Sequence, residues 1–395
     1  MLRIGQFSET FLPVVDGVGR VVNAYAETLA GMGHEITVVT PMNDTGYRGR
    51  LPFEIVDFTG FKVPKINQYR LGEPTMDPHY RRRMRMIDLD ICHAHTPFMA
   101  GTEALRIAAQ RDIPLVATFH SKYYDDFLKT TGSENLAKIG IRYVVDFYNR
   151  CDEVWTVNDN TADVLRGYGY EGPIRIVENG VKVYRVTDEE IRKTEERYGL
   201  GKYPMLLFVG QMNWKKNILC VLEAAARLKE DGRHFRLVLA GMGPDVKEIS
   251  RKVTEMGLNG HCVMTGHVTD PDVLGALYAR ASLFVFPSLY DTSGMVVREA
   301  AVMGTPSVMV RGATASDTIT EGVNGFLCEN DSADLARVLD RALNDEALLK
   351  AVGEQAQKTI PVSWNTIMDQ AVGLYEELIE KNRMGQLNKK VPRVL

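Results

Sequence analysis

Short apolar runs alternate with longer helical segments along the first half of the chain. The runs occupy residues 2–7, 35–40, 53–56, 91–94, 115–119, 153–158 and 174–177. Strands separated by helices in this way give the βαβ rhythm of a parallel, doubly wound sheet. The pattern predicts an α/β fold in which ligands gather at the carboxyl ends of the strands.

The same alternation starts again after a highly charged, helical segment at residues 187–198. A chain of 395 residues is too long for one hydrophobic core, so two domains are expected. We predict an N-terminal domain at 1–185, a C-terminal domain at 186–362 and a final helical segment at 363–385.

Residues 284–306, FVFPSLYDTSGMVVREAAVMGTP, form the most informative stretch. Pro287 closes an apolar run that reads as a strand, and a short loop follows. From Gly294 the pattern is helical, until Gly304 offers a left-handed cap and Pro306 prevents continuation. The stretch is therefore expected to be a strand, a loop and a helix, followed by the next strand.

Two acids flank the start of this predicted helix. Asp291 lies in the loop and Glu299 lies about two turns into the helix. The N–H groups of Gly294, Met295 and Val296 would form an anion site at the helix N-terminus. A diphosphate site beside carboxylates that accept hydroxyls suggests a nucleotide-sugar, although an ordinary βαβ crossover with surface acids has the same pattern.

A second candidate for phosphate binding follows the strand at 205–209. Gly210 and Gln211 lead to Lys215 and Lys216, just before a helix at 218–230. A glycine allows close backbone approach and the lysines supply fixed positive charge, which together suit a diphosphate.

Gly17 and Gly19 are predicted to lie in a loop just before a helix at 21–32. Glycines there would let a phosphate or a sugar approach the backbone. Residue 22 is Val22, so the third glycine of a GxGxxG dinucleotide motif is absent.

Composition narrows the class of protein. The net charge of −4 gives no support to a nucleic-acid partner. The five cysteines show no CxxC or framework spacing, the first residues contain no signal-like core, and no run of about 18 apolar residues occurs. These features predict a cytoplasmic protein without disulfides or a zinc site.

Two polar patterns leave alternatives open. His93 and His95 could bind a metal ion, but no third ligand lies nearby in the sequence, so a role at a strand end is favoured. Residues 80–86, YRRRMRM, are either a solvated helix face or a contact for anionic lipid headgroups.

Asp291, Glu299 and the continuation Ala300 to Pro306 resemble the acid-x7-acid signature of retaining GT-B glycosyltransferases, in particular family 4. The first acid is Asp291 rather than the usual Glu, and Ser293 stands where an aromatic residue often precedes the glycine. Asp-Thr-Ser-Gly looks more like the Thr-Gln-Gly variant of bacterial glycerolipid glucosyltransferases.

The resemblance covers almost the whole chain and implies two Rossmann-like domains that face a cleft. The last helix would cross back to the N-terminal domain, with the acceptor held by the first domain and the donor by the second. It implies hexose transfer from a nucleoside diphosphate sugar with retention, and neither a cofactor nor a metal ion.

The resemblance also implies roles for individual residues. Glu299 would bind the ribose, while Asp291 and His120, at the Thr-x-His position after the strand at 115–119, would contact the transferred sugar. Gln211 replaces the usual Arg of the diphosphate site, and residues 266–268 would contact the nucleobase through their backbone. The remaining donor contacts would be Gly17, Gly19, Gln211, Lys215, Lys216, Gly266, His267, Val268, Ser293, Gly294, Met295 and Val296.

Residues 121–127, SKYYDDF, resemble the acceptor-side stretch of the glycerolipid enzymes and are expected to form a loop with Tyr123, Tyr124 and Asp125 toward the acceptor. UDP-glucose as donor, diacylglycerol as acceptor and a peripheral position on the inner membrane face are favoured. The alternatives are a soluble sugar phosphate or inositol acceptor, a nucleotide-sugar 2-epimerase and a non-catalytic sensor of nucleotide-sugars.

Overall fold

The computed structural model describes residues 1–13, 16–42, 50–63 and 66–387 of the chain. The chain divides into two compact units. Unit 1 contains Met1–Asn179 and Trp364–Leu395, and unit 2 contains Gly180–Ser363. The division lies at Asn179, before the boundary expected at residue 185, because Val181 pairs with the end of unit 2 at Val362 and Ser363.

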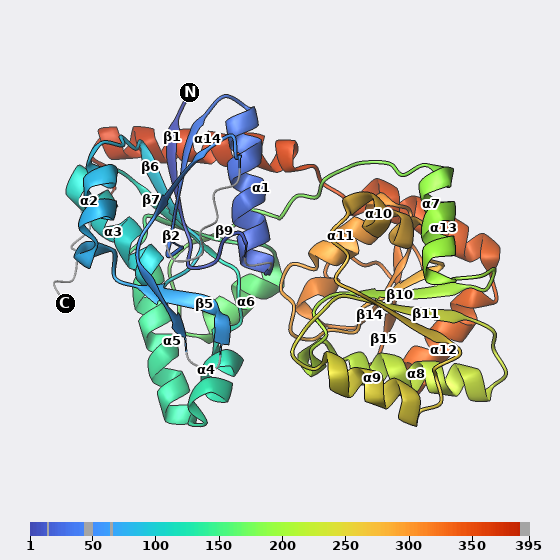
Figure 1. The fold of residues 1–395 in the computed structure, drawn as a ribbon. Coiled ribbons are helices and arrows are strands. Elements are labelled where there is room, and N and C mark those ends of the chain that lie inside the picture. Colours follow the sequence, from blue (N-terminus) through green and yellow to red (C-terminus); the bar gives the residue numbers. More distant parts are fainter. Residues whose placement is uncertain (14–15, 43–49, 64–65, 388–395) are drawn as a thin grey trace. The chain divides into compact units, whose positions relative to one another are not determined.

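Unit 1 is built on a parallel sheet whose described strands follow the order β3-β2-β1-β6-β7-β8-β9 (Figure 1). The strands of this sheet are β1 (Arg3–Phe7), β2 (Glu35–Thr40), β3 (Glu54–Asp57), β6 (Ile91–Ala94), β7 (Leu115–Phe119), β8 (Glu153–Thr156) and β9 (Ile174–Ile176). An antiparallel pair, β4 (Gly60–Val63) and β5 (Ile66–Gly72), was not expected from the sequence.

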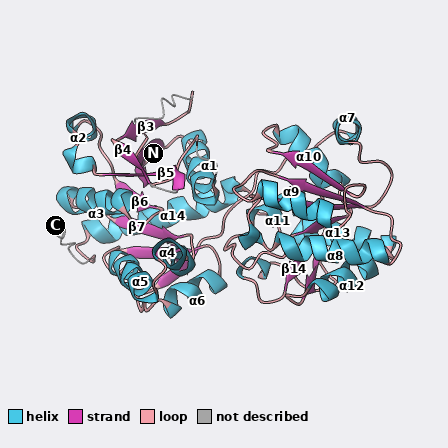
Figure 2. Cartoon of the chain, turned by 60° about the horizontal axis from the view of Figure 1, so that its bottom comes forward, coloured by secondary structure: helices cyan, strands magenta, loops and turns pink. Residues whose placement is uncertain are grey.

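Helices flank the sheet of unit 1 (Figure 2). They are α1 (Gly17–Gly31), α2 (Pro78–Arg85), α3 (Met99–Arg111), α4 (Tyr123–Thr131), α5 (Glu134–Tyr148), α6 (Asp159–Gly167) and α14 (Trp364–Arg383), with a short 3₁₀ turn η1 (Pro74–Met76). Helix α14 comes from the far end of the chain and packs against α1. No helix in the described ranges is both long enough and apolar enough to span a bilayer.

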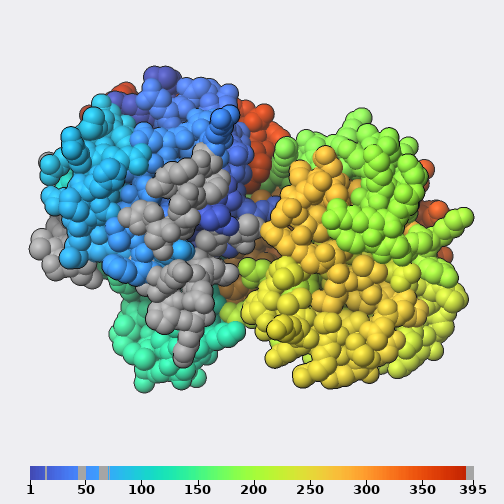
Figure 3. Space-filling model, viewed as in Figure 1, coloured from blue at the N-terminus to red at the C-terminus, as the bar shows by residue number. Residues whose placement is uncertain are grey.

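Unit 2 has a second parallel sheet, of order β12-β11-β10-β13-β14-β15. The strands are β10 (Met205–Val209), β11 (Arg236–Ala240), β12 (Cys262–Gly266), β13 (Leu283–Val285), β14 (Ser307–Val310) and β15 (Gly325–Cys328). The helices are α7 (Asp188–Tyr198), α8 (Ile218–Glu230), α9 (Val246–Glu255), α10 (Pro271–Arg280), α11 (Met295–Val302), α12 (Ser332–Leu343) and α13 (Glu346–Thr359), with 3₁₀ turns η2 (Trp214–Lys216) and η3 (Thr314–Ser316). The segments from α7 to α10, coloured green to amber, cover the face of unit 2 seen in Figure 3.

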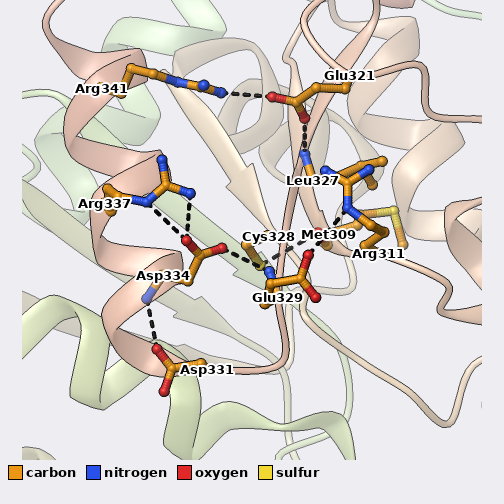
Figure 4. A network of polar contacts seen from close by, with 10 residues as sticks. All are labelled: Met309, Arg311, Glu321, Leu327, Cys328, Glu329, Asp331, Asp334, Arg337 and Arg341. Carbon is orange, nitrogen blue, oxygen red and sulfur yellow. Dashed lines mark hydrogen bonds and ion pairs between the residues drawn. The ribbon is translucent and has the colours of Figure 1, made fainter.

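A polar network joins the end of β15 to α12 (Figure 4). Arg341 binds the Glu321 carboxylate at 2.7 Å, and Arg337 binds Asp334. Asp334 also accepts from the Glu329 backbone N–H at 2.8 Å. The contacts are mostly solvent-exposed, so each stabilises unit 2 by less than about 1 kcal/mol.

The loops that follow β10 and β11 lie close together because each begins with a glycine. Gly241 has φ of +145°, and a Cβ built there would lie 1.9 Å from the Gly210 carbonyl oxygen. Met212 N–H donates to the Met242 carbonyl at 3.0 Å, and its own carbonyl accepts from Asp245 N–H. The backbones after β10 and β11 therefore approach more closely than side chains would allow.

Buried Glu9 ties the loop after β1 to the start of α3. Thr96 Oγ1 donates to one carboxyl oxygen and Ala100 N–H donates to the other. Burial nevertheless raises the pKa of the Glu9 carboxyl from its ordinary 4.5 to about 7, against these two hydrogen bonds.

Glu9 should make the stability of unit 1 depend on pH. Because the folded-state pKa is raised, the carboxyl contributes stability below pH 4.5, and that contribution is lost as pH rises through 7. The free energy of unfolding of the wild type, relative to Glu9→Gln, should therefore fall by about 3 kcal/mol between pH 4.5 and 8. Urea unfolding across that range measures it, and parallel curves for the two proteins would contradict a raised pKa.

Candidate nucleotide-sugar site

The candidate donor residues of unit 2 lie at the point where its sheet reverses direction. Strands β10 and β13 are neighbours, but the chain continues from β10 to β11 on one side and from β13 to β14 on the other. Ligands of open α/β sheets bind outside the carboxyl ends of strands at such a switch point. Lys215 and Lys216 follow β10, and the loop that carries Asp291 follows β13.

Lys216 and Asp291 meet across this edge. Lys216 Nζ lies 2.5 Å from Asp291 Oδ1, and both side chains are about four-fifths buried. Ser288, fully buried, donates from Oγ to Asp291 Oδ2 at 2.6 Å. Two residues that are 75 positions apart in sequence thus form one charged pair whose carboxylate is fixed on both oxygens.

Two more contacts position the lysines. Lys215 Nζ lies 4.7 Å from the centroid of the Tyr290 ring, and Lys216 Nζ lies 5.5 Å from it. Asn217 adopts φ of 59° and donates from Nδ2 to the Pro287 carbonyl at 3.1 Å. The turn after β10 is therefore attached to the loop after β13, and both ammonium groups are held near one aromatic face.

Helix α11 begins at this loop. Gly294 is its N-cap, with φ of 57°, and a Cβ there would lie 3.1 Å from the Ala315 side chain. Among the described residues no side chain caps the helix, and its first N–H groups, at Met295 and Val296, are directed out of the N-terminus without an intrahelical partner. Ser293 precedes the cap. The arrangement suits an anion close to Lys216.

Glu299 lies further along α11, half-buried. Tyr278, buried in α10, donates its hydroxyl to Glu299 Oε2 at 2.9 Å. The carboxylate is thereby oriented by a residue of the neighbouring helix, which suits an acceptor of ligand hydroxyls.

The other predicted donor residues of unit 2 also follow strand ends. Gln211, the second residue after β10, is half-buried, and Gly266 ends β12 with φ of 71°. His267 is exposed and Val268 half-buried. Because β12, β11 and β10 are parallel, these residues lie at the same edge of the sheet as the Lys216 turn.

In unit 1 the expectation of a glycine loop before the first helix is wrong. Gly17 and Gly19 lie in the first turn of α1, because Asp16 caps the helix and accepts from Gly19 N–H at 2.7 Å. A side chain at residue 19 would meet the Phe11 backbone at 3.4 Å. The glycine therefore allows close packing of the loop after β1 on the helix, and the predicted phosphate contact of both residues stays a prediction.

The expected acceptor loop at 121–127 is mostly helical. Tyr123, Tyr124 and Asp125 form the first turn of α4. The Tyr123 ring is buried against Phe98, Phe119 and Phe127, so it packs in the core. Tyr124 is half-buried and Asp125 exposed, and their acceptor role stays a prediction. The polar residues of this stretch concealed a helix whose first aromatic residue, Tyr123, packs inward on Phe98 and Phe119.

His120 follows β7 at the carboxyl edge of the unit 1 sheet, as expected, but it is buried. Its Nε2 lies 3.0 Å from His95 Nδ1, and desolvation lowers its pKa from 6.5 to about 3. His93 contacts Tyr375 and Thr118 through its two ring nitrogens. In the described part of the chain, no three His, Cys, Asp or Glu side chains are grouped to hold a metal ion.

Sequence reasoning missed several residues that orient the site. Ser288 and Tyr278 fix the two acids, and Asn217 fixes the lysine turn. Gln6 contacts His95. Only Asn217 had a local signal, since an asparagine before a helix tolerates a left-handed backbone.

Two family models match the chain. Residues 15–185 match the Glycosyltransferase Family 4 model, and residues 189–359 match the model for Glycosyl transferases group 1. Together the models cover most of both units.

Two relatives match this chain over most of both lengths, and both are named as enzymes of sugar transfer or glycolipid synthesis. An alpha-monoglucosyldiacylglycerol synthase from Acholeplasma laidlawii is 26% identical, over 98% of this chain and 100% of its own length. A GDP-mannose-dependent alpha-mannosyltransferase from Corynebacterium glutamicum is also 26% identical, over 96% of this chain and 89% of its own.

Solved structures share the fold at lower identity. HepE from Anabaena, in complex with UDP-glucose, is 19% identical with a TM-score of 0.75, and covers 96% of this chain and 100% of its own. The two parallel-sheet units have the GT-B architecture of these neighbours. With both matched models and this fold, the chain belongs to the family 4 glycosyltransferases.

Proposed function

We propose that this protein transfers a hexose from UDP-glucose, with retention at the anomeric carbon, to a hydroxyl of a membrane glycerolipid such as diacylglycerol. The observation that carries the donor half is the Lys216–Asp291 pair at the switch point, beside the N-terminus of α11. Glycosyl transfer passes through an oxocarbenium-like state, so a departing diphosphate must be stabilised. Lys215, Lys216 and the first N–H groups of α11 supply that stabilisation.

The ion pair also gives Asp291 its role. A bound diphosphate competes with Asp291 for the Lys216 ammonium, which leaves a carboxylate oxygen to accept a hydrogen bond from a sugar hydroxyl. Ser288 keeps the other oxygen in place during this exchange. Glu299, oriented by Tyr278, accepts from the ribose hydroxyls. The contact of His120 with the transferred hexose is carried over from the family resemblance.

The names of relatives support the choice of substrates. The Acholeplasma laidlawii relative is named for a glycolipid, which favours a lipid acceptor, and the Anabaena structure contains UDP-glucose. The Corynebacterium glutamicum relative is named for GDP-mannose, so that donor is the main competitor.

Helix α2 supports contact with an anionic bilayer. Tyr80 and Met84 are buried, so the outer face carries Arg81, Arg82 and Arg85. Arg83 forms ion pairs with Glu54 and Asp57, so its positive charge is already balanced within the protein. Met86, at the end of the helix, is 80% exposed. The surface segment that contains α2 lies in the pale blue part of unit 1 (Figure 3).

The donor and the acceptor can be identified in one experiment. We expect release of UDP from UDP-glucose, stimulated by anionic vesicles that contain diacylglycerol, in a panel of UDP-, GDP- and ADP-sugars. The anomeric proton coupling of the isolated glycolipid reports retention. If vesicles have no effect while a soluble sugar phosphate or inositol stimulates release, the lipid acceptor is wrong. If the nucleotide-sugar is epimerised in the absence of any acceptor, the enzyme is an epimerase rather than a transferase.

Lys216→Gln should reduce kcat about 10²- to 10³-fold, the usual loss when one group that stabilises developing charge is removed. The matched control is Lys229→Gln, because Lys229 lies at the far end of α8, where its Nζ donates to the Gly257 carbonyl at 2.9 Å. Thermal unfolding of both variants shows whether the fold is intact. Full turnover by a folded Lys216→Gln protein would remove Lys216 from the mechanism.

Replacing Arg81, Arg82 and Arg85 together by Gln should weaken vesicle binding by about a hundredfold, since each charge near an anionic surface adds about 1 kcal/mol. Turnover with a water-soluble short-chain acceptor should be unchanged. The control replaces three bases of α7, Arg192, Lys193 and Arg197, by Gln. Flotation with anionic vesicles at two salt concentrations measures the effect, and equal loss in both triple variants would exclude a specific role for α2.

A further inference from the structure

Tyr290 belongs to the loop after β13, and its ring packs on both lysines of the turn after β10. The ring centroid is 4.7 Å from Lys215 Nζ and 5.5 Å from Lys216 Nζ. Both distances are within the limit of about 6 Å at which the face of an aromatic ring attracts an ammonium group. All three residues are only partly exposed, so water weakens these contacts less than it would on an open surface.

One hydroxyl fixes both the backbone of Tyr290 and the side chain of Asp291. Tyr290 N–H donates to Ser288 Oγ at 3.3 Å, and Ser288 Oγ donates to Asp291 Oδ2 at 2.6 Å. Asp291 Oδ1 in turn lies 2.5 Å from Lys216 Nζ. The aromatic ring and the carboxylate therefore belong to one short turn, and both contact the lysines.

The two partners of the lysines have different effects on the local charge. Asp291 is an anion, so it balances one of the two positive charges while it holds Lys216. The ring of Tyr290 has no net charge and attracts an ammonium group through its quadrupole, so the positive charge is retained. Together Lys215, Lys216 and Asp291 keep one net positive charge, which lies beside the N-terminus of α11.

Two adjacent lysines are otherwise difficult to hold together. Each ammonium group is attached to a flexible stem that loses rotamer entropy when it is ordered, and the two like charges repel each other. An aromatic face that attracts both ammonium groups offsets these two costs. Lys215 is thereby ordered beside Lys216 before a ligand binds, and the ligand does not have to order it.

We propose that Tyr290 is a positioning residue of the donor site, which holds Lys215 beside Lys216 so that one diphosphate contacts both ammonium groups. The inference rests on the proposed function for the identity of that anion, the diphosphate of the nucleotide-sugar. A nucleoside monophosphate has a single phosphate group and gains less from a second cation. Tyr290 therefore contributes to the preference for a nucleoside diphosphate over a monophosphate.

The contact between Tyr290 and Lys215 can be measured without a ligand. Protons above the face of an aromatic ring are shifted upfield, so we expect a shifted Lys215 ε-methylene signal in ¹H–¹³C spectra of protein labelled with ¹³C-lysine. Lys215→Gln assigns this signal, and Tyr290→Leu should return it to its ordinary position. An unshifted signal in the wild type would overturn the proposal. Because the spectrum needs no substrate, it is independent of whether the proposed reaction is correct.

Binding of UDP and UMP tests the role of the ring. Tyr290→Leu should weaken UDP binding about tenfold, as expected for loss of a partly buried cation–π contact, and UMP binding less than about threefold. Tyr290→Phe keeps the aromatic face and should bind UDP within about twofold of the wild type. Calorimetry at constant ionic strength measures both ligands. Full UDP affinity in a folded Tyr290→Leu protein, or equal losses for UDP and UMP, would contradict the proposal.

A double-mutant cycle shows whether Tyr290 acts through Lys215. Lys215→Gln should weaken UDP binding about tenfold in the wild-type background and less than about threefold in the Tyr290→Leu background, where the lysine is no longer held in place. Equal losses in the two backgrounds would leave Tyr290 with only a structural role. The matched control is Tyr198→Leu, which removes a 5.3 Å contact with Arg197 at the end of α7 and should leave UDP binding unchanged.

The outcomes separate Tyr290 from the choice of donor. If the wild type binds GDP but not UDP, UDP-glucose is wrong, and the same comparison with GDP and GMP decides the role of Tyr290. If the wild type binds no nucleoside diphosphate, both proposals are overturned. If Tyr290→Leu does not fold, the wild-type spectrum and Lys215→Gln still decide, because an unshifted Lys215 signal or unchanged UDP binding by Lys215→Gln would overturn the inference.

Discussion

The reversal of strand order between β10 and β13 is the constraint on which the candidate donor site depends. It places two turns that are distant in sequence at one edge of a sheet, where their side chains meet. The Lys216–Asp291 pair, Asn217 and Ser288 join these turns. The charged groups are thereby preorganised, and binding of a diphosphate has to exchange one ion pair rather than order two loops.

The two units differ in the kind of polar side chain that they bury. Unit 2 places the Lys216–Asp291 pair, about four-fifths buried, beside the N-terminus of α11, where an anionic ligand can neutralise the lysine. Unit 1 buries neutral hydrogen-bonding groups, Gln6 and three histidines, which contact one another, Tyr375 and Thr118. Charge is concentrated where a diphosphate is proposed to leave, and neutral acceptors where a hydroxyl is proposed to bind.

Much of the fold could be predicted from the sequence because parallel strands are buried on both faces and read as apolar runs. The bounds expected for residues 91–94, 115–119 and 205–209 coincide with β6, β7 and β10. The start of α1 was missed because the two glycines of its first turn read as a loop, and α4 because polar residues occupy its outer face. Tyr278 and Gln6 could not be found, since their partners Glu299 and His95 are distant in sequence. Ser288 lies only three residues before Asp291, but the sequence does not show that its hydroxyl is directed at that carboxylate.

Helix α14 gives the chain an order of assembly. It packs on α1, its Tyr375 hydroxyl contacts His93, and the Tyr25 ring packs on Trp364. These partners are synthesised long before it, with all of unit 2 in between. During translation unit 2 can therefore fold as soon as its own segment has emerged, whereas the core around His93 has to wait for the last helix to leave the ribosome.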